Sequence, residues 1–237
     1  EWTMIDSAGY SIPFDSSLNQ INLYESAKSD HVVLNDRFQA YIQDNVIFFA
    51  GESTMHLTYG IRAHYTSYTN ELAVSPRASL SLKPSWKRDW LFYFSTGYYP
   101  QPAFYREMRD PDGVINRNLR SQKSCHFVLG GDYNFVTMNR PFKFTTEIYY
   151  KYLWDLVPYK IENVRLQYAA DNMASGYAAG IDFKVNGEFI KGTESWFSMS
   201  FMQTREKSSG TMFTDANGTT SQLGYYPRPS DQLVHFG

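Results

Sequence analysis

The chain has 237 residues, with 22 Lys and Arg against 24 Asp and Glu, a formal net charge of −2 at pH 7, and one cysteine. This near-neutral charge argues against a dedicated nucleic-acid-binding protein, which carries a basic excess or a basic stripe. A single cysteine excludes an internal disulfide framework and a zinc site built from cysteines. Because the sequence has no run of about 18 apolar residues, it encodes no transmembrane helix.

The composition indicates an architecture with two different faces. Aromatic residues make up 17% of the chain, yet the mean hydropathy is −0.45, which is polar. A β-sheet reconciles the two values, because successive side chains of a strand point to opposite sides of the sheet.

The first 36 residues are predicted to form a loop-rich lead-in, since 1–30 is rich in Ser, Asn and Asp. From residue 37 onward the main signal is an alternation of apolar and polar residues, which is typical of β-strands. The clearest alternating runs are 55–66, 124–135, 142–155 and 177–189.

The run that follows Pro141 shows the alternation best. One face carries Phe142, Phe144, Thr146, Ile148, Tyr150, Tyr152 and Trp154, and the other carries Lys143, Thr145, Glu147, Tyr149 and Lys151. The run is longer than an average globular strand of about 5–6 residues and matches the roughly 9–11 residues that a tilted strand needs to cross a bilayer. It has the apolar-out, polar-in pattern of an outer-membrane β-barrel.

Short and long connections alternate along the chain. The short ones are 51–53, 84–89, 137–141 and 190–194, and the long ones are 67–73, 100–123, 157–176 and 208–230. This alternation is typical of periplasmic turns and extracellular loops. Trp86, Trp90 and Trp196 lie beside short turns, where an interfacial aromatic belt is expected.

The pattern predicts an all-β fold, namely an antiparallel transmembrane β-barrel segment of about nine to ten long strands. Residues 233–237 look like the start of a further strand. An open sheet would leave unpaired edges in lipid. We therefore expect that 37–237 is part of a larger barrel, whose further strands lie outside this sequence.

Nine short motifs are spread along 37–237. They are YIQDN (41–45), YGIR (59–62), SPRASL (75–80), GYYPQP (97–102), IYYK (148–151), DLVPY (155–159), GYAAGID (176–182), ESW (194–196) and RPSDQ (228–232). Together they resemble the barrel of TonB-dependent outer-membrane receptors, and the last four are similar to the Bacteroidetes branch of that family.

The resemblance implies a barrel of about 22 strands with a plug domain in its lumen, in the outer membrane of a Gram-negative bacterium. Such receptors import a scarce nutrient, such as a metal chelate, a vitamin or a glycan, and TonB drives import by pulling on the plug. The implied partners are outer-membrane lipids, the protein's own plug domain, TonB and a surface lipoprotein, with no nucleic acid and no cofactor.

This sequence contains neither a plug nor a TonB box. Residues 37–237 therefore correspond to part of the barrel wall, with short periplasmic turns and long extracellular loops. Residues 1–36 correspond to a mostly extracellular lead-in.

Catalysis and metal binding are not predicted, so we expect that the protein is not an enzyme. The sequence has no G-x-S-x-G, no H-E-x-x-H and no phosphate-binding glycine loop. Its five histidines are scattered, and Cys125 and His126 are neighbours that point to opposite faces of a strand. The segment 215–219 departs from a calcium loop because no bidentate Glu follows it.

Aromatic and polar residues around two long loops are candidates for ligand binding. Stacking faces next to hydrogen-bonding groups suit a glycan or a chelate, although an interfacial girdle with loop packing explains the same residues. The candidates are Tyr98, Tyr99, Gln101, Phe104, Tyr105 and Arg106 at the first loop, and Trp154 and Tyr159 at the next.

Charged residues on the polar sides of the predicted strands are candidates for lining the lumen or contacting the plug. Arg62, His64, Arg77 and Lys83 form a positive stripe that suits an anionic ligand or, equally, an acidic plug surface. Further candidates are Lys143, Glu147, Lys151, Asp182 and Lys184. Among them Glu147 and Lys151, two strand steps apart on the same face, form a charge ladder.

Two other functions fit the same sequence. One is a small, complete outer-membrane barrel with a structural or adhesive role, and the other is a soluble β-sandwich that binds glycans. A complete barrel closes by pairing its first and last strands, whereas a sandwich buries its apolar faces and folds without detergent.

Overall fold

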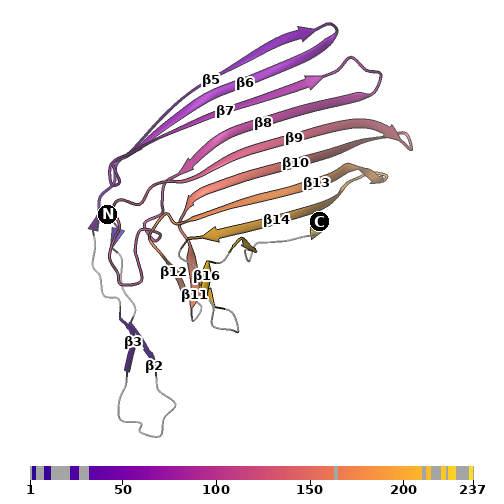
Figure 1. Ribbon diagram of the computed structural model, residues 1–237. Coiled ribbons are helices and arrows are strands. Elements are labelled where there is room, and N and C mark those ends of the chain that lie inside the picture. Colours follow the sequence, from indigo (N-terminus) through magenta and orange to yellow (C-terminus); the bar gives the residue numbers. More distant parts are fainter. Residues whose placement is uncertain are drawn as a thin grey trace.

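The computed structural model describes residues 32–162, 165–209 and 224–227, together with short strands outside these ranges (Figure 1). Those short strands are β1 (Trp2–Thr3), β2 (Ala8–Ser11), β3 (Asn22–Ser26), β15 (Met212–Thr214), β16 (Thr220–Gln222) and β18 (His235–Phe236). Among the described residues, no helix is long and apolar enough to span a membrane.

One antiparallel sheet makes up most of the described structure. Its long strands are β5 (Arg37–Ala50), β6 (Ser53–Thr66), β7 (Glu71–Lys83), β8 (Asp89–Gln101), β9 (Gln122–Thr137), β10 (Arg140–Leu156), β13 (Ala174–Ile190) and β14 (Thr193–Ser208). Each pairs with the next along the chain, and β17 (Tyr226–Pro227) and β18 both pair with the outer edge of β14. The all-β, antiparallel prediction is confirmed, with nine strand positions in the described sheet, eight of which hold long strands.

Short hairpins occur in segments that the sequence predicted as loops. β2 pairs with β3 inside the predicted lead-in, and β11 (Tyr159–Glu162) pairs with β12 (Arg165–Tyr168) in the connection after β10. β1 also pairs with β4 (Val32–Val33). Strands of two to five residues are too short to give a clear alternating pattern, which explains why the sequence did not predict them.

The connections alternate as predicted, with tight turns at one end of the sheet and longer loops at the other (Figure 1). The turn between β9 and β10 consists of Met138 and Asn139, whose φ angles of 54° and 58° fit the two-residue type I′ hairpin turn. One expectation was wrong, because 67–73 is not a long loop. β7 begins at Glu71, which already pairs with Thr66 on β6.

The pairing register gives the sheet one apolar face and one polar face. One row on the apolar face runs across the strands through Val46, Leu57, Leu80, Phe94, Leu129, Ile148, Ile181 and Phe201. The neighbouring row on the polar face runs through His56, Ser81, Tyr93, Gly130, Glu147, Asp182 and Ser200. The alternation that the sequence shows in single strands therefore continues across the whole sheet.

The apolar face has no covering layer among the described residues. Leu129 and Ile148, in the middle of the sheet, are 56% and 55% exposed. The hydrophobic core cluster lies instead among the loops and consists of Ala103, Met108, Leu119 and Val157. The middle of the sheet is therefore not packed against a globular interior.

Two groups of aromatic rings flank the middle of the apolar face. Near the tight turns, the turn-end aromatic band consists of Trp86, Trp90, Phe92, Tyr133, Phe135, Phe142 and Phe189, whose contacting rings have centroids 4.5–5.9 Å apart. Near the loops, the loop-end aromatic band consists of Tyr98, Tyr150, Tyr152, Trp154, Tyr177 and Tyr225, at 5.5–6.1 Å.

Trp196, which the sequence assigned to an aromatic belt, lies on the polar face instead. It is opposite Asn186 on β13, and the Lys184 ammonium lies 5.6 Å from its ring centroid. The short turn beside Trp196 was predicted correctly. The face to which Trp196 points, however, depends on its position within β14. An aromatic residue near a turn can therefore belong to either face.

Candidate functional site

The nine charged residues predicted to line a lumen all lie on the polar face. The register places them there on four strands, β6, β7, β10 and β13. They are Arg62, His64, Arg77, Lys83, Lys143, Glu147, Lys151, Asp182 and Lys184. They share one face because side chains of the same parity in each strand point to the same side of the sheet.

Several charged groups near the tight turns are paired with each other. The Lys143 ammonium lies 2.8 Å from the Asp132 carboxylate, and the Lys83 ammonium lies 2.6 Å from the Asp89 carboxylate. The Thr145 hydroxyl donates to the second oxygen of Asp132 at 2.8 Å. Lys83 and Lys143 are thus neutralised within the sheet, whereas the Lys184 ammonium lies against the Trp196 ring.

Glu147 is held by a tyrosine from two strands away. Tyr93 on β8 is opposite Gly130 on β9, which in turn is opposite Glu147 on β10. The Tyr93 hydroxyl donates to Glu147 Oε1 at 2.6 Å, so the tyrosine ring crosses over Gly130, where any Cβ atom would overlap it. Lys151, the other member of the predicted charge ladder on β10, has its ammonium 5.4 Å from the Tyr149 ring centroid.

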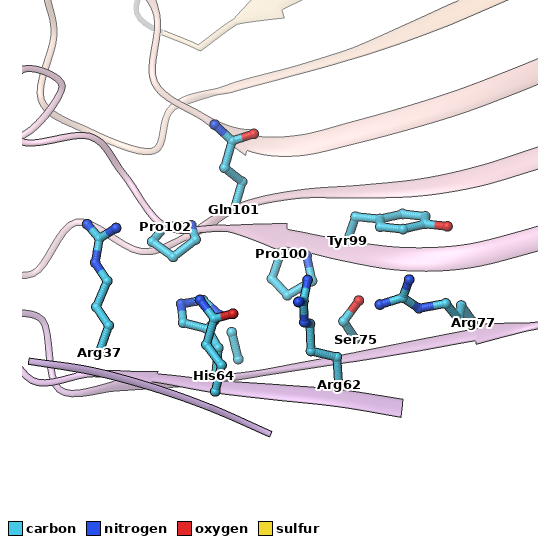
Figure 2. Close-up of a pocket in the computed structure, with 11 residues that line it drawn as sticks. Arg37, Arg62, His64, Ser75, Arg77, Tyr99, Pro100, Gln101 and Pro102 are labelled. Atoms are coloured by element: carbon cyan, nitrogen blue, oxygen red, sulfur yellow. The ribbon is translucent and has the colours of Figure 1, made fainter. Parts of the chain in front are cut away.

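A pocket of about 420 Å³, which we call the arginine pocket, lies on the polar face of β5–β8 (Figure 2). It is lined by Arg37, Gln39, Arg62, His64, Ala73, Ser75, Arg77, Tyr99, Pro100, Gln101 and Pro102. In Figure 2, the Arg62 side chain rises toward Pro100, and the Arg77 guanidinium points toward Ser75 and Arg62, below the Tyr99 ring. With three arginines and no acidic lining residue, the pocket has a positive potential.

The predicted ligand-binding residues of β8 and β10 fall on both faces. Tyr99 and Gln101 line the arginine pocket. Tyr98 and Trp154 lie on the apolar face, where their ring centroids are 5.7 Å apart in the loop-end aromatic band. Because neighbouring residues of a strand point to opposite sides, Tyr98 and Tyr99 do not share a site.

The other four predicted ligand-binding residues lie in or beside the loops. The Tyr105 hydroxyl accepts a hydrogen bond from Asn35 Nδ2 at 2.9 Å, so Tyr105 helps to fix the loop structure. Tyr159 is the first residue of the β11 hairpin strand. Phe104 and Arg106 are exposed. These four side chains are not among the residues that line the arginine pocket.

Sequence reasoning missed Arg37, Gln39 and Ser75 as site residues. Arg37 and Gln39 alternate with Phe38 and Ala40, so a period of two could have placed them on a polar face. Their position beside the pocket depends on the pairing of β5 with β6, which the period alone does not give.

Asn172 joins the two long loops, since its side chain makes three hydrogen bonds to backbone. It accepts from the Arg120 N–H at 2.7 Å and donates to the carbonyls of Arg120 and Asp155 at 3.0 and 2.6 Å. We expect Asn172→Ala to speed amide hydrogen exchange in 102–121, with about 1–3 kcal/mol of local stability lost because three hydrogen bonds to backbone groups disappear. Asn116→Ala is the control, because it removes only one bond between the loops, to the Ala170 carbonyl, and one local bond from the Asn118 N–H; an equal effect would contradict this role.

Among the described residues, no group of three or more His, Cys, Asp and Glu side chains could hold a metal ion. The predicted loop 215–219 and the motif 228–232 lie outside the described residues. Comparison of the chain with family models, with curated proteins and with solved structures gives no match. The function is therefore argued from the geometry of the two faces.

Proposed function

We propose that this chain forms part of the wall of an outer-membrane β-barrel, and that the barrel is a TonB-dependent transporter that imports a scarce nutrient. The observation that carries the proposal is the exposed apolar face between its two aromatic bands. Soluble monomers rarely expose large contiguous apolar surfaces, whereas a barrel wall presents such a surface to lipid.

The spacing of the two aromatic bands suits a bilayer. Phe142 and Trp154 belong to different bands and lie twelve positions apart on β10. At about 3.3 Å per residue, the distance along the strand is about 40 Å, and a tilt of about 40° gives a height of about 30 Å. Outer-membrane barrels have an apolar zone about 25 Å tall between aromatic girdles, so the two bands would sit at the two interfaces.

The apolar face is almost free of charge in its middle. Among the described residues, the carboxylate there is Asp44 on β5, which accepts a hydrogen bond from the Tyr59 hydroxyl at 3.1 Å. An acidic residue on the lipid side of a barrel costs less than Lys or Arg, and this hydrogen bond offsets part of the cost. The charged residues Lys143, Glu147 and Lys151 lie on the other face, as a water-exposed or plug-filled lumen requires.

β5 has an open edge in the described sheet. It pairs with β6 and with no other described strand, and all 14 of its residues are exposed. Unpaired backbone groups are not tolerated in the hydrocarbon region, so in the proposed barrel a further strand pairs with β5. A wall of about 22 strands, as the resemblance to TonB-dependent receptors implies, provides such a strand.

The transport part of the proposal rests on that resemblance and on the arginine pocket below the loops. The protein's own plug would fill the lumen, TonB would move it, and the loops 102–121 and 157–173 would capture the ligand. A soluble sandwich is disfavoured because it would cover Leu129 and Ile148 with a second sheet. A small closed barrel is disfavoured because it would pair β5 with the last strand, whereas β5 pairs only with β6 among the described strands.

Spin labels on two neighbouring residues of β9 test the membrane wall. In the full-length protein, reconstituted in bilayers with Cys125 replaced by serine, labels are attached at V128C on the polar face and at L129C on the apolar face. Because oxygen concentrates in lipid whereas a nickel chelate stays in water, we expect the label at 129 to collide mainly with oxygen and the label at 128 to be shielded from lipid. A label at 129 that is accessible mainly to nickel would overturn the proposal.

TonB dependence is tested separately by uptake. Strains that lack this protein and strains that lack TonB are expected to lose uptake of the same nutrient. Loss in the first strain with full uptake in the second would contradict an energised importer.

A further inference from the structure

We infer that the arginine pocket binds a small organic polyanion, a molecule with at least two carboxylate or phosphate groups and an apolar part. The inference rests on the proposed function, because it names the chemical class of nutrient that the barrel would carry. Its evidence, however, is the charge and shape of the pocket itself.

The pocket carries positive charge that no described carboxylate neutralises. Arg37, Arg62 and Arg77 have no Asp or Glu oxygen within 4.0 Å among the described residues. On the same face, Lys83 and Lys143 lie 2.6 and 2.8 Å from carboxylates. The sheet therefore neutralises these two lysines near the tight turns, whereas the three arginines gather in one pocket without an ion pair among the described residues.

Glu71 lies near the pocket in the strand register, but its carboxylate is engaged elsewhere. It precedes the pocket residue Ala73 by two positions, and its Oε2 accepts from the backbone N–H and the hydroxyl of Ser121 at 2.9 and 2.7 Å. Ser121 is completely buried. The contact fastens the start of β9 to the start of β7. The Glu71 carboxylate keeps its charge and offsets part of the positive field near His64, but within the described structure it forms no ion pair with the three arginines, so the pocket keeps a net positive charge.

Arg62 and Arg77 are placed to hold the same anionic group. Arg62 is opposite Ser75, and Arg77 lies two residues further along β7, so the two residues are diagonal neighbours, about 7–8 Å apart. Each guanidinium offers a planar pair of N–H donors that matches a carboxylate or a phosphate. Arg37, whose guanidinium carbon lies 5.6 Å from the Tyr105 ring centroid, provides a third cation for a second anionic group.

The opposite wall of the pocket is largely apolar. It is formed by Tyr99, Pro100 and Pro102 (Figure 2), and the Tyr99 ring lies 4.5 Å from the ring of His126 on β9. Small-molecule sites have volumes of about 300–1,000 Å³, and this pocket of about 420 Å³ falls in that range. A compact molecule with charges on one side and carbon on the other would match both walls, whereas a neutral glycan would leave the arginines unpaired.

Isothermal titration of the full-length protein in detergent at low salt tests the site. The anionic probes are tricarballylate and inorganic pyrophosphate, and the neutral probe is glucose. We expect at least one anion to bind, and we expect R62Q and R77Q each to weaken binding by about tenfold or more, because each removes charge-assisted hydrogen bonds.

The matched control is K83Q, which removes one positive charge from the same face and from the same strand as Arg77. We expect it to change the affinity by less than about twofold, because Lys83 is remote from the pocket and exposed. R77K keeps the charge but loses the planar fork, so its affinity is expected to lie between those of the wild type and R77Q.

Binding of tricarballylate, alone or with pyrophosphate, would support the inference. Binding of pyrophosphate alone would support a polyanion site for phosphates and would overturn the requirement for an apolar part. No binding of either anion, glucose binding as tight as theirs, or an equal loss in K83Q would overturn it. If R62Q fails to fold by circular dichroism, the comparison of R77Q with K83Q decides. If the label at 129 faces lipid but no anion binds, only this inference is overturned. If an anion binds but the label at 129 faces water, only the proposed barrel is overturned.

Discussion

Replacement of Gly130 by alanine is expected to lower the free energy of unfolding of the sheet by about 2 kcal/mol, because the new methyl group displaces the Tyr93 ring and breaks its bond to Glu147. A Cβ atom at position 130 would overlap the ring, and the hydroxyl donates to the carboxylate at 2.6 Å. A hydrogen bond to a charged group contributes about 1.5–3 kcal/mol. Urea unfolding of the full-length protein in lipid measures the change.

Gly131 offers a matched control on the same strand but on the other face. A Cβ atom there would lie 3.4 Å from Phe92 Cδ1, which is an ordinary contact. Gly131→Ala is therefore expected to leave stability unchanged or to raise it by about 0.5–1 kcal/mol, since alanine loses less backbone freedom than glycine. Equal destabilisation by the two alanines would show that the crossing of Tyr93 over Gly130 is not the cause.

A double-mutant cycle isolates the crossing contact. Tyr93→Phe removes the hydroxyl and keeps the ring, so part of the effect of Gly130→Ala should disappear in that background. Residues in contact usually show coupling of about 0.5–3 kcal/mol. Strict additivity of the two substitutions would contradict a shared hydrogen bond.

Leu129→Lys is expected to destabilise the protein in a bilayer by about 2–4 kcal/mol, the cost of a lysine on the lipid side of a barrel at mid-depth. Leu129 lies in the central apolar row, between Phe94 and Ile148, and is 56% exposed. The measurement is the urea unfolding midpoint in bilayers of uniform thickness.

The neighbouring substitution Val128→Lys provides the comparison, because Val128 lies on the polar face between Ser95 and Tyr149. A lysine there can extend its ammonium into the lumen, so we expect a loss below about 1 kcal/mol. If the two lysines were equally costly, or if Leu129→Lys had no effect, the apolar face would not be in contact with lipid.

The two faces of the sheet could be predicted from local sequence. In 142–155 the alternation alone places Lys143, Glu147 and Lys151 together and Ile148 opposite them, because the side-chain period of a strand does not depend on its partners. Tight turns could also be predicted from local sequence, since a two-residue hairpin turn such as Met138–Asn139 depends only on its own backbone conformation.

The contacts between strands could not be predicted in the same way. Tyr93 and Glu147 are 54 positions apart and meet only because both are in register with Gly130. Tyr105 had the composition of a ligand-binding residue but packs in the loops, where its partner Asn35 comes from 70 positions away. Such pairings depend on the alignment of strands and on the packing of loops, for which no single segment carries a signal.

The sequence by itself determined that this chain forms long, two-faced antiparallel strands with alternating turns and loops, because period and turn chemistry are local properties. Only the tertiary structure decided that Arg37, Arg62 and Arg77 gather around one pocket while Tyr98 and Trp154 stack on the opposite face. The physical reason is register: shifting one strand by a single residue would move all its side chains to the other face, and register is fixed by the whole set of neighbouring strands.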